Sequence, residues 1–369
     1  MKRRITPKLR AVGVLAASIA VLAGCGASEE SADGTTKVRV ITGGGPISDS
    51  QFSIGEEMGY NDAEGLDVEV AIADGSSQAM QLLVAGQADV AVASLEAFLS
   101  TADAGHDVVG VSLAYGAGDG FMFGIMVPED SPYQAVGDLP KGSVVGVTGW
   151  AGGEVPVATA MLQDAGFDTT SEVELLPVGD EPASIFHAFQ SGTIDAFGGS
   201  LTDFGALGAQ GYEFRGIESP NSESFPIGAM IATTSEYAEA NPAVIESIGR
   251  IWNKASYVWY EYPEAITVAT KAAFPEAWAE DADTQYIIDV YRDIYQPAPP
   301  DAFGQIDIEG TVLYAELLQN VEPVEGGEVD ISGAVDVSTV LTNDYIPAMN
   351  DWDRAEVLAA AKEYAASAA

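Results

Sequence analysis

The chain has 369 residues with 15 Lys and Arg against 56 Asp and Glu, which gives a net charge of −41 at neutral pH. This charge excludes a nucleic-acid-binding surface, because affinity for nucleic acid depends on neutralising phosphates with Lys and Arg, and it disfavours adsorption to anionic lipid headgroups. Hydrophobic residues form 47% of the chain, enough for a large core, and a chain of this length usually divides into two domains. We interpret the charge as a solvated acidic coat.

The N-terminus predicts a secretory signal over residues 1–24. Basic residues within the first ten positions precede an apolar run over residues 11–24, which is shorter than the ~20 apolar residues that span a bilayer. Residues 22–25 resemble a bacterial lipobox, in which Cys25 would receive a diacylglyceryl group and become the mature N-terminus. Cys25 is the only cysteine, so no intrachain disulfide is possible. We therefore expect a lipid anchor on the outer face of the cell membrane, followed by a flexible tether over residues 25–36.

Beyond the tether, strand and helix patterns alternate, which is typical of α/β lobes with mostly parallel sheets. The patterns predict strands over residues 38–42 and 66–72 and helices over residues 51–59 and 77–85. Gly86 is suited to end the second of these helices. No later segment has an uncharged apolar run long enough to span a bilayer.

One helix–strand unit occurs twice. Residues 86–94 contain Gly, then Asp three positions on and Ser five further on, and residues 192–200 repeat this spacing at an offset of 106. In both copies Gly ends a helix, Asp begins a short buried strand, and Ser stands at the carboxyl end of the strand, where open α/β sheets bind their ligands. The repeat predicts two similar lobes that clamp a ligand, with Ser94 and Ser200 facing it. A chance match of one unit is the alternative.

Two apolar strands, over residues 121–127 and 225–232, bracket the second copy and predict two crossovers between lobes, as hinge closure requires. The second lobe is expected to comprise residues 123–232. The first is expected to comprise residues 37–122 and 233–369. Its C-terminal part is expected to be helical, over residues 241–260, 263–274, 284–295 and 353–366.

A series of motifs carries a family resemblance. They lie at residues 56–60, 64–68, 75–77, 85–89, 130–139, 146–153 and 192–196. Their order resembles that of the nitrate/sulfonate/taurine-type and thiamine-precursor-type solute-binding proteins, from about residue 38 to residue 260. The resemblance implies a two-lobed type II periplasmic-binding-protein fold with the ligand cleft between the lobes. It also implies delivery of a small-molecule ligand to an ABC permease and its ATPase, and we expect a monomer.

The resemblance also implies which segments contact the ligand. They are the loop after the first strand, the Gly-Ser-Ser helix start, the strand end before the first crossover and the Gly-rich helix start of the second lobe. Carried over to this sequence, with the two repeat serines, the expected contact residues are Thr42, Gly45, Ser48, Phe52, Ser76, Ser77, Ser94, Tyr115, Trp150, Gly152, Gly153, Ser200 and Asp203.

An enzyme is the weaker interpretation. The two histidines, His106 and His187, fall in a polar turn and in an amphipathic helix, where surface or packing roles are commoner than catalysis. Residues 198–202 lack the final Gly of a nucleophile elbow, and residues 43–48 lack the last Gly of a dinucleotide fingerprint. The family has a branch that makes a thiamine pyrimidine with a His and a Cys-rich loop, which this chain lacks. We expect no cofactor and no metal site, because no calcium-loop spacing occurs.

The type of ligand and its destination are less constrained. The segments expected to line the crevice have no Lys, Arg or His but contain acidic residues: Asp49, Asp119, Glu154, Asp180, Glu181 and Asp203. Aromatic walls could come from Phe52, Phe98, Tyr115, Phe121 and Trp150. We expect a neutral or amine-bearing, partly flat organic solute, with an alkanesulfonate or nitrate-type anion as the alternative. A lipoprotein receptor that signals ligand occupancy to a membrane partner would use the same clamp and is the alternative to import.

Overall fold

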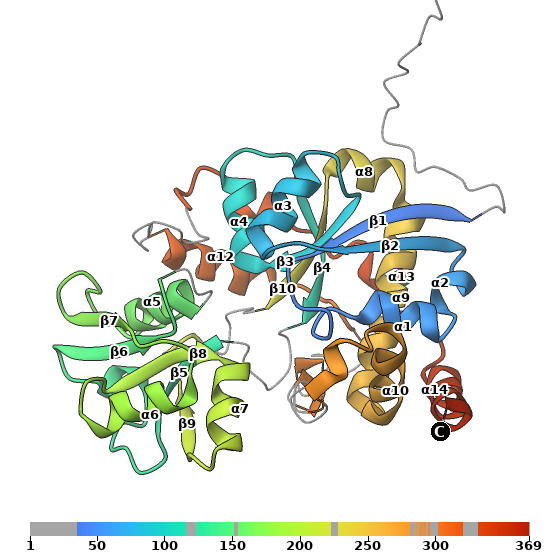
Figure 1. Cartoon of the computed structure of the whole chain (residues 1–369). Helices are drawn as coiled ribbons and strands as arrows, with labels where there is room; N and C mark the ends of the chain where they lie inside the picture. The colour runs from blue at the N-terminus through green and yellow to red at the C-terminus, as the bar shows by residue number, and fades with distance from the viewer. Residues whose placement is uncertain are drawn as a thin grey trace, which may run out of the picture.

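The computed structural model describes residues 35–115, 123–150, 154–222, 228–280, 302–319 and 331–368, with residues 285, 288–289, 291–292 and 294–295. Two five-stranded sheets with flanking helices form two lobes (Figure 1), which confirms the expected two-lobed α/β fold. The signal segment and Cys25 lie outside the described residues. Among the described helices, none combines the length and apolar character that crossing a bilayer requires.

The first sheet has one antiparallel strand, next to its edge, in an otherwise parallel arrangement. It contains β1 (Thr36–Thr42), β2 (Leu66–Ile72), β3 (Val90–Ser94), β4 (Val109–Tyr115) and β10 (Ala229–Thr233). The strand order is β2-β1-β3-β10-β4. β1 pairs in parallel with β2 and β3, whereas β10 runs antiparallel to both of its neighbours. The uninterrupted apolar sequence of β3 fits this central position, because a strand covered on both faces needs no polar alternation.

The second sheet repeats this arrangement. It contains β5 (Phe123–Pro128), β6 (Ser143–Val147), β7 (Val173–Pro177), β8 (Ala196–Ser200) and β9 (Phe214–Ile217). The order is β7-β6-β8-β5-β9, with β6 parallel to β7 and β8, and β5 antiparallel to β8 and β9. β6, β7 and β8 therefore correspond to β1, β2 and β3.

The antiparallel strands, β5 and β10, each come directly after a strand of the other lobe's sheet. β5 follows β4 of the first sheet, and β10 follows β9 of the second. The chain thus crosses between the lobes twice, as the bracketing strands predicted. It rejoins the first sheet at Ala229, ahead of the boundary expected at Thr233.

Helices cover both sheets. Those of the first lobe's N-terminal part are α1 (Gln51–Glu57), α2 (Tyr60–Ala63), α3 (Ser76–Val84) and α4 (Leu95–Asp103). The second lobe has α5 (Glu154–Asp164), α6 (Pro182–Gln190) and α7 (Leu201–Ala209). The C-terminal part adds α8 (Ser235–Ala240), α9 (Pro242–Glu261), α10 (Pro263–Ala273), α12 (Ile308–Leu318), α13 (Ile346–Met349) and α14 (Arg354–Ala368). α12 also contacts α5, so it touches both lobes.

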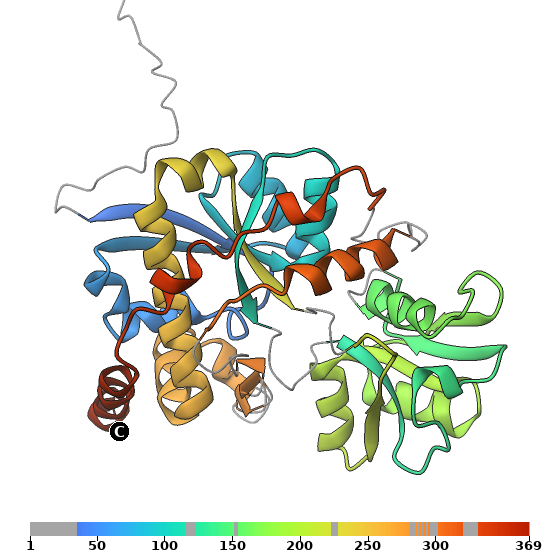
Figure 2. The ribbon, with the colours of Figure 1, turned by 180° about the vertical axis from the view of Figure 1, so that it is seen from behind.

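The long helix α9 packs into the core of the first lobe along most of its length (Figure 2). Its buried residues recur every three or four positions, as one helix face requires: Ile245, Ile248, Trp252, Ala255 and Trp259. Trp252 Nε1 donates to the Ala114 carbonyl at 2.8 Å, and Trp259 Nε1 donates to the Ile288 carbonyl at 2.9 Å. α9 therefore fixes the end of β4 and the segment around Ile288.

The repeated sequence unit is also a structural repeat. Gly86 and Gly192 follow α3 and α6 with φ of +70° and +67°, the left-handed conformation that favours Gly after a helix. The strands that follow then begin in the same way. The carboxylate of Asp89 accepts a 2.8 Å hydrogen bond from the amide of Arg39 on β1, and that of Asp195 accepts a 2.9 Å bond from the amide of Val144 on β6.

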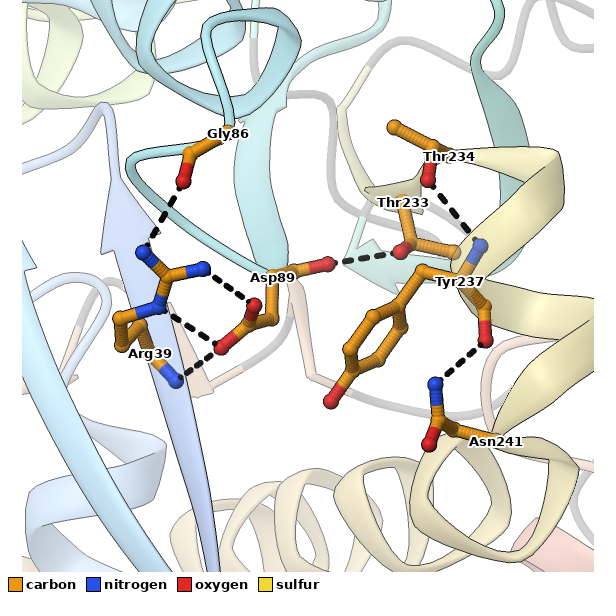
Figure 3. Close-up of polar contacts among 7 residues, drawn as sticks. All are labelled: Arg39, Gly86, Asp89, Thr233, Thr234, Tyr237 and Asn241. Atoms are coloured by element: carbon orange, nitrogen blue, oxygen red, sulfur yellow. Dashed lines mark hydrogen bonds and ion pairs between the residues drawn. The ribbon is translucent and has the colours of Figure 1, made fainter. Parts of the chain in front are cut away.

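The first copy contains an ion pair between Arg39 and Asp89, which Figure 3 shows. In the first lobe the Arg39 guanidinium contacts both oxygens of Asp89, at 2.6 and 3.1 Å, and donates to the Gly86 carbonyl at 2.9 Å. Thr233 Oγ1 donates to the Asp89 carbonyl at 2.6 Å and joins β10 to this corner. In the second lobe Val144 replaces Arg39. The repeated Asp is therefore a strand-start anchor, remote from the strand end where the repeated Ser stands.

Candidate ligand-binding site

Four of the expected contact residues end strands. Thr42, Ser94 and Tyr115 end β1, β3 and β4 of the first sheet, and Ser200 ends β8 of the second. Both crossovers meet these edges, because Ser200 pairs with Phe123 at the start of β5 and Ser94 pairs with Ala229 at the start of β10. The polar ends of both sheets therefore adjoin the connections between the lobes, where α/β sheets bind ligands.

Ser76 and Ser94 meet in the first lobe. The Ser94 amide donates to Ser76 Oγ at 2.9 Å, and Ser94 Oγ accepts from the Ala97 amide at 3.2 Å, which caps α4. A side-chain oxygen at this position satisfies one of the free amides of a helix start. Ser94 therefore stabilises α4 as well as standing at the strand end, and Ser77 lies half-buried beside Ser76.

Ser200 has the equivalent place in the second lobe. Ser200 Oγ and the Asp203 amide are 3.3 Å apart, while the Asp203 carboxylate accepts from the Ser200 amide and hydroxyl at 2.7 and 2.6 Å. These reciprocal bonds form a capping box at the start of α7. The Ser200 hydroxyl already donates to the Asp203 carboxylate, whereas Ser94 Oγ accepts in its bond from the Ala97 amide.

The Gly-rich turn of the second lobe is held by a buried acid. Glu154, 4% exposed, accepts from the Thr148 amide at 2.9 Å and from the Thr148 hydroxyl. This bond fixes the end of β6 against the start of α5. Trp150 projects from the same turn with 44% of its surface exposed. Gly152 and Gly153 lie outside the described residues.

The glycines after β1 allow unusually close packing. A Cβ on Gly43 would lie 2.5 Å from Ser76 Cα, and a Cβ on Gly44 would lie 2.4 Å from Asp49 Oδ2. Gly45 is exposed, and its amide donates to Ser48 Oγ at 2.9 Å. The Gly-rich sequence therefore brings Asp49 directly against the end of the first strand.

Asp49 is the most unusual group in this region. Its residue is 5% exposed, Oδ2 accepts a 2.9 Å hydrogen bond from the Gly44 amide, and Oδ1 has no hydrogen-bond partner among the described residues. Burial raises the pKa of Asp49 from 3.8 to about 7, although the Gly44 amide and the Tyr115 hydroxyl favour the charged form and lower it. A buried carboxylate without a cation is costly.

Three tyrosines lie against this acid. The ring of Tyr115 is 5.7 Å from that of Tyr295 and 6.3 Å from that of Tyr291, both nearly perpendicular to it, and the Tyr291 and Tyr295 rings are 6.2 Å apart. The Tyr295 hydroxyl donates to the Ser48 carbonyl. Burial, reinforced by the negative charge of Asp49, raises the pKa of all three phenols, so they are neutral at physiological pH. We call Tyr115, Tyr291 and Tyr295 the tyrosine wall.

The second lobe adds negative charge to this wall. The Asp203 carboxylate, at the start of α7, contributes to the raised pKa of Tyr291, after burial and Asp49. Asp203 belongs to the second lobe, so its charge acts on Tyr291 from the other lobe. Acidic groups from both lobes thus act on the same aromatic surface.

The expected aromatic walls are only partly the observed ones. Tyr115 belongs to the tyrosine wall, but Phe52 and Phe98 are fully buried, and Phe52 packs on Trp252 at 5.3 Å between ring centres. Both phenylalanines are therefore core residues, and Phe121 lies outside the described residues. Tyr291 and Tyr295 are not among the expected contact residues, although their spacing of one helical turn inside an expected helix is a usable signal.

Comparison with known proteins identifies the family. The profile of the family described as NMT1/THI5 like matches residues 50–266, more than half of the chain. The chain belongs to the NMT1/THI5-like family. The resemblance drawn from the sequence motifs is thereby confirmed. No curated protein sequence matches the chain.

Solved structures share the fold of this NMT1/THI5-like chain. The periplasmic aliphatic sulphonate binding protein SsuA from Escherichia coli is 19% identical, with 77% of this chain and 85% of that chain covered and a TM-score of 0.58. The alkanesulfonate-binding protein SsuA from Xanthomonas axonopodis pv. citri, bound to MOPS, is 17% identical, with coverages of 81% and 97% and a TM-score of 0.52. The desulfurization enzyme DszB is 15% identical, with coverages of 85% and 98% and a TM-score of 0.52. At these identities the likeness shows the fold alone.

The strand ends bring together polar and aromatic groups. Within the described residues, no group of His, Cys, Asp and Glu could hold a metal ion. His106 and His187 are both exposed. The groups brought together at the strand ends are an acid, neutral phenols, helix-capping hydroxyls and backbone amides, which can hold and orient a small molecule.

Proposed function

We propose that this chain is the extracytoplasmic solute-binding lipoprotein of an ABC importer, which captures a small organic solute between its lobes and delivers it to a permease and its ATPase. The observation that carries the proposal is that Ser94 and Ser200, at equivalent strand ends of the two sheets, pair with the first residues of the strands that follow the two crossovers. Two crossovers join lobes of equivalent topology, so rotation about them would close both sets of groups on one ligand.

Membership of the NMT1/THI5-like family and the shared periplasmic-binding-protein fold support this function. The expected signal segment and lipobox support a location on the outer side of the membrane, with an anchor through Cys25. The proposed ligand contacts are the strand-end residues Thr42, Ser94, Tyr115 and Ser200, together with Ser48, Ser76, Ser77, Trp150 and Asp203 and with Gly45, Gly152 and Gly153 of the Gly-rich turns.

A catalytic function is the less favoured proposal, although DszB shows that this fold also occurs in an enzyme. Neither histidine has a place at the strand ends, since His106 follows α4 and His187 lies near the end of α6. We therefore propose binding without chemistry.

Native mass spectrometry tests the proposal directly. Protein purified gently from its own host, without dialysis, should carry a small-molecule mass increment that disappears on mild denaturation. Refolded protein should recover the same increment from a low-molecular-weight extract of the host's medium, and should then melt at a higher temperature by mass action. Protein that takes up no solute from the extract would contradict the proposed function.

A further inference from the structure

The structure provides one group that solute capture alone does not explain, the buried Asp49. Its Oδ1 has no hydrogen-bond partner in the part of the chain that the structure describes, and the Asp49 residue is only 5% exposed. Gln51, which is fully buried, lies beside Tyr295, and the contact between its side chain and the Tyr295 hydroxyl adds a polar group to this region. Buried polar groups normally have partners, so each exception calls for an explanation such as a ligand.

Three basic side chains of the same lobe are engaged elsewhere, and no cation is among the groups that shift the pKa of Asp49. Arg292, next to Tyr291, donates to the Tyr260 carbonyl at 2.8 Å and lies over the Tyr260 ring. Arg250 and Lys254 on α9 both pair with Glu64, at 2.8 and 2.7 Å. Asp49 therefore faces no cation from the described residues, and the neighbouring charge that reaches its tyrosine wall, from Asp203, is also negative.

The tyrosine wall supplies the second element of cation recognition. The faces of aromatic rings attract cations through their quadrupole, and the attraction grows when water is excluded. Tyr291 and Tyr295 are 8% and 2% exposed, so the surface beside Asp49 is poorly hydrated. Acidic and aromatic groups together favour a positive ligand and disfavour a negative one, since two carboxylates repel an anion.

We propose that Asp49 and the tyrosine wall bind the positively charged amine of the solute, with Asp203 approaching it as the lobes close. The solute is then an organic cation, either a protonated or a quaternary amine. This inference rests on the proposed function and specifies its ligand class. It opposes the sulfonate chemistry named for the two SsuA relatives.

A protonated Asp49 offers the rival explanation, because a neutral carboxyl could donate a hydrogen bond to a neutral or anionic ligand. The two explanations predict opposite pH dependence. Cation binding needs the ionised carboxylate, so affinity for a quaternary amine should rise between pH 5 and pH 8. A ligand that accepts a hydrogen bond from the protonated Asp49 carboxyl should instead lose affinity as the pH rises from 5 to 8. The tyrosines that face Asp49 stay neutral throughout and do not change the sign.

Titration calorimetry with matched probes tests the inference. Choline and benzylamine are the cations, 3,3-dimethylbutan-1-ol and benzyl alcohol are their neutral isosteres, and phenylmethanesulfonate is the anion. At least one cation should bind more tightly than its isostere, and its affinity should rise with pH. Asp49→Asn should weaken that cation about 10- to 100-fold, because a hydrogen-bonded charge partner is lost. The exposed Asp74→Asn, with the same charge change, should have no effect.

Substitutions of Tyr291 test whether the tyrosine wall contributes to cation affinity. Tyr291→Phe should retain most of the cation affinity, whereas Tyr291→Leu should lower it about 2- to 30-fold, the range expected for a lost cation–π contact. If neither cation binds, or if the isosteres or phenylmethanesulfonate bind as tightly, the amine assignment is wrong. Tight sulfonate binding would leave the proposed transport function standing, whereas failure to recover any solute from the host extract would remove it.

Discussion

The backbone amide of Gly44 donates a 2.9 Å hydrogen bond to Asp49 Oδ2, and the two residues pack so closely that Gly44 has no room for a side chain. The turn after β1 thus determines where the buried acid lies. This acid and the tyrosine wall form the part of the site that the first lobe provides. The contact between Gly44 and Asp49 leads to the first prediction.

Gly44→Ala should displace the Asp49 carboxylate. A Cβ there would lie 2.4 Å from Oδ2 and 2.7 Å from Cγ, well inside contact distance. Overpacking of this kind costs ~1–3 kcal/mol of unfolding free energy, and solute binding should be lost with it. Gly45→Ala is the matched control for stability alone, because its Cβ would meet only Ser48 Oγ at 3.5 Å. Urea denaturation should show a lower unfolding free energy for Gly44→Ala and an unchanged one for Gly45→Ala, and calorimetry should show that Gly44→Ala no longer binds solute. Equal stability of the two variants would contradict the close packing of Gly44 on Asp49.

Asp49 should make the solute-free protein less stable as pH rises. Its pKa is raised to about 7, so the folded state binds this proton more tightly than the unfolded chain does. The contribution of the bound proton is full below about pH 4 and is lost as pH rises through about 7. Asp49→Asn should remove this dependence, and the variant should melt higher than the parent protein at pH 8. Melting curves at pH 5 and pH 8 provide the test, with Asp74→Asn as the control, and an unchanged slope in Asp49→Asn would contradict it.

The repeat serines should affect stability as well as binding, because both cap helices. Ser94→Ala and Ser200→Ala should each lower the unfolding free energy by ~0.5–2 kcal/mol, with Ser200→Ala at the upper end because the Asp203 bonds are lost too. Ser94→Thr and Ser200→Thr keep the capping oxygen and should recover most of this loss. Chemical denaturation distinguishes the two sets, and equal stability of all four variants would contradict the capping role.

The lipid anchor predicts a simple change in location. Cys25→Ser should leave the precursor unprocessed or release the protein from the membrane, because no other thiol can accept the acyl group. Fractionation and labelling with a radioactive fatty acid measure both outcomes. A Cys25→Ser variant that remains acylated and membrane-bound would show that the anchor is elsewhere.

The fold was largely predictable from the sequence because its signals are local. The apolar run of β3, the Gly86 turn and the spacing from Asp89 to Ser94 are contiguous, and their repetition at residues 192–200 exposes the internal symmetry. The exchange of β10 into the first sheet was less apparent, because pairing of Ala229 with Ser94 joins residues far apart in the chain. This pairing makes β10 part of the first sheet although it directly follows the second lobe in the chain.

The site was predictable only in part. The strand-end residues Ser94 and Ser200 follow from position, but whether an aromatic ring lines a site or fills the core depends on tertiary packing. Phe52 illustrates this, since only contact with Trp252 identifies it as core. Tyr291 joins Asp49 only because α9 holds its segment through Trp259. No sequence pattern around Asp49 or around Tyr291 indicates that these two residues are neighbours.

Closure on a solute is the central claim, and small-angle X-ray scattering measures it most directly. The solute identified by native mass spectrometry is added at saturation, and the radius of gyration is compared with that of the solute-free protein. We predict that the radius of gyration falls, because the lobes rotate about the two crossovers and bring Asp203 towards Asp49. A solute that binds tightly and raises the melting temperature yet leaves the radius of gyration unchanged would contradict capture between the lobes.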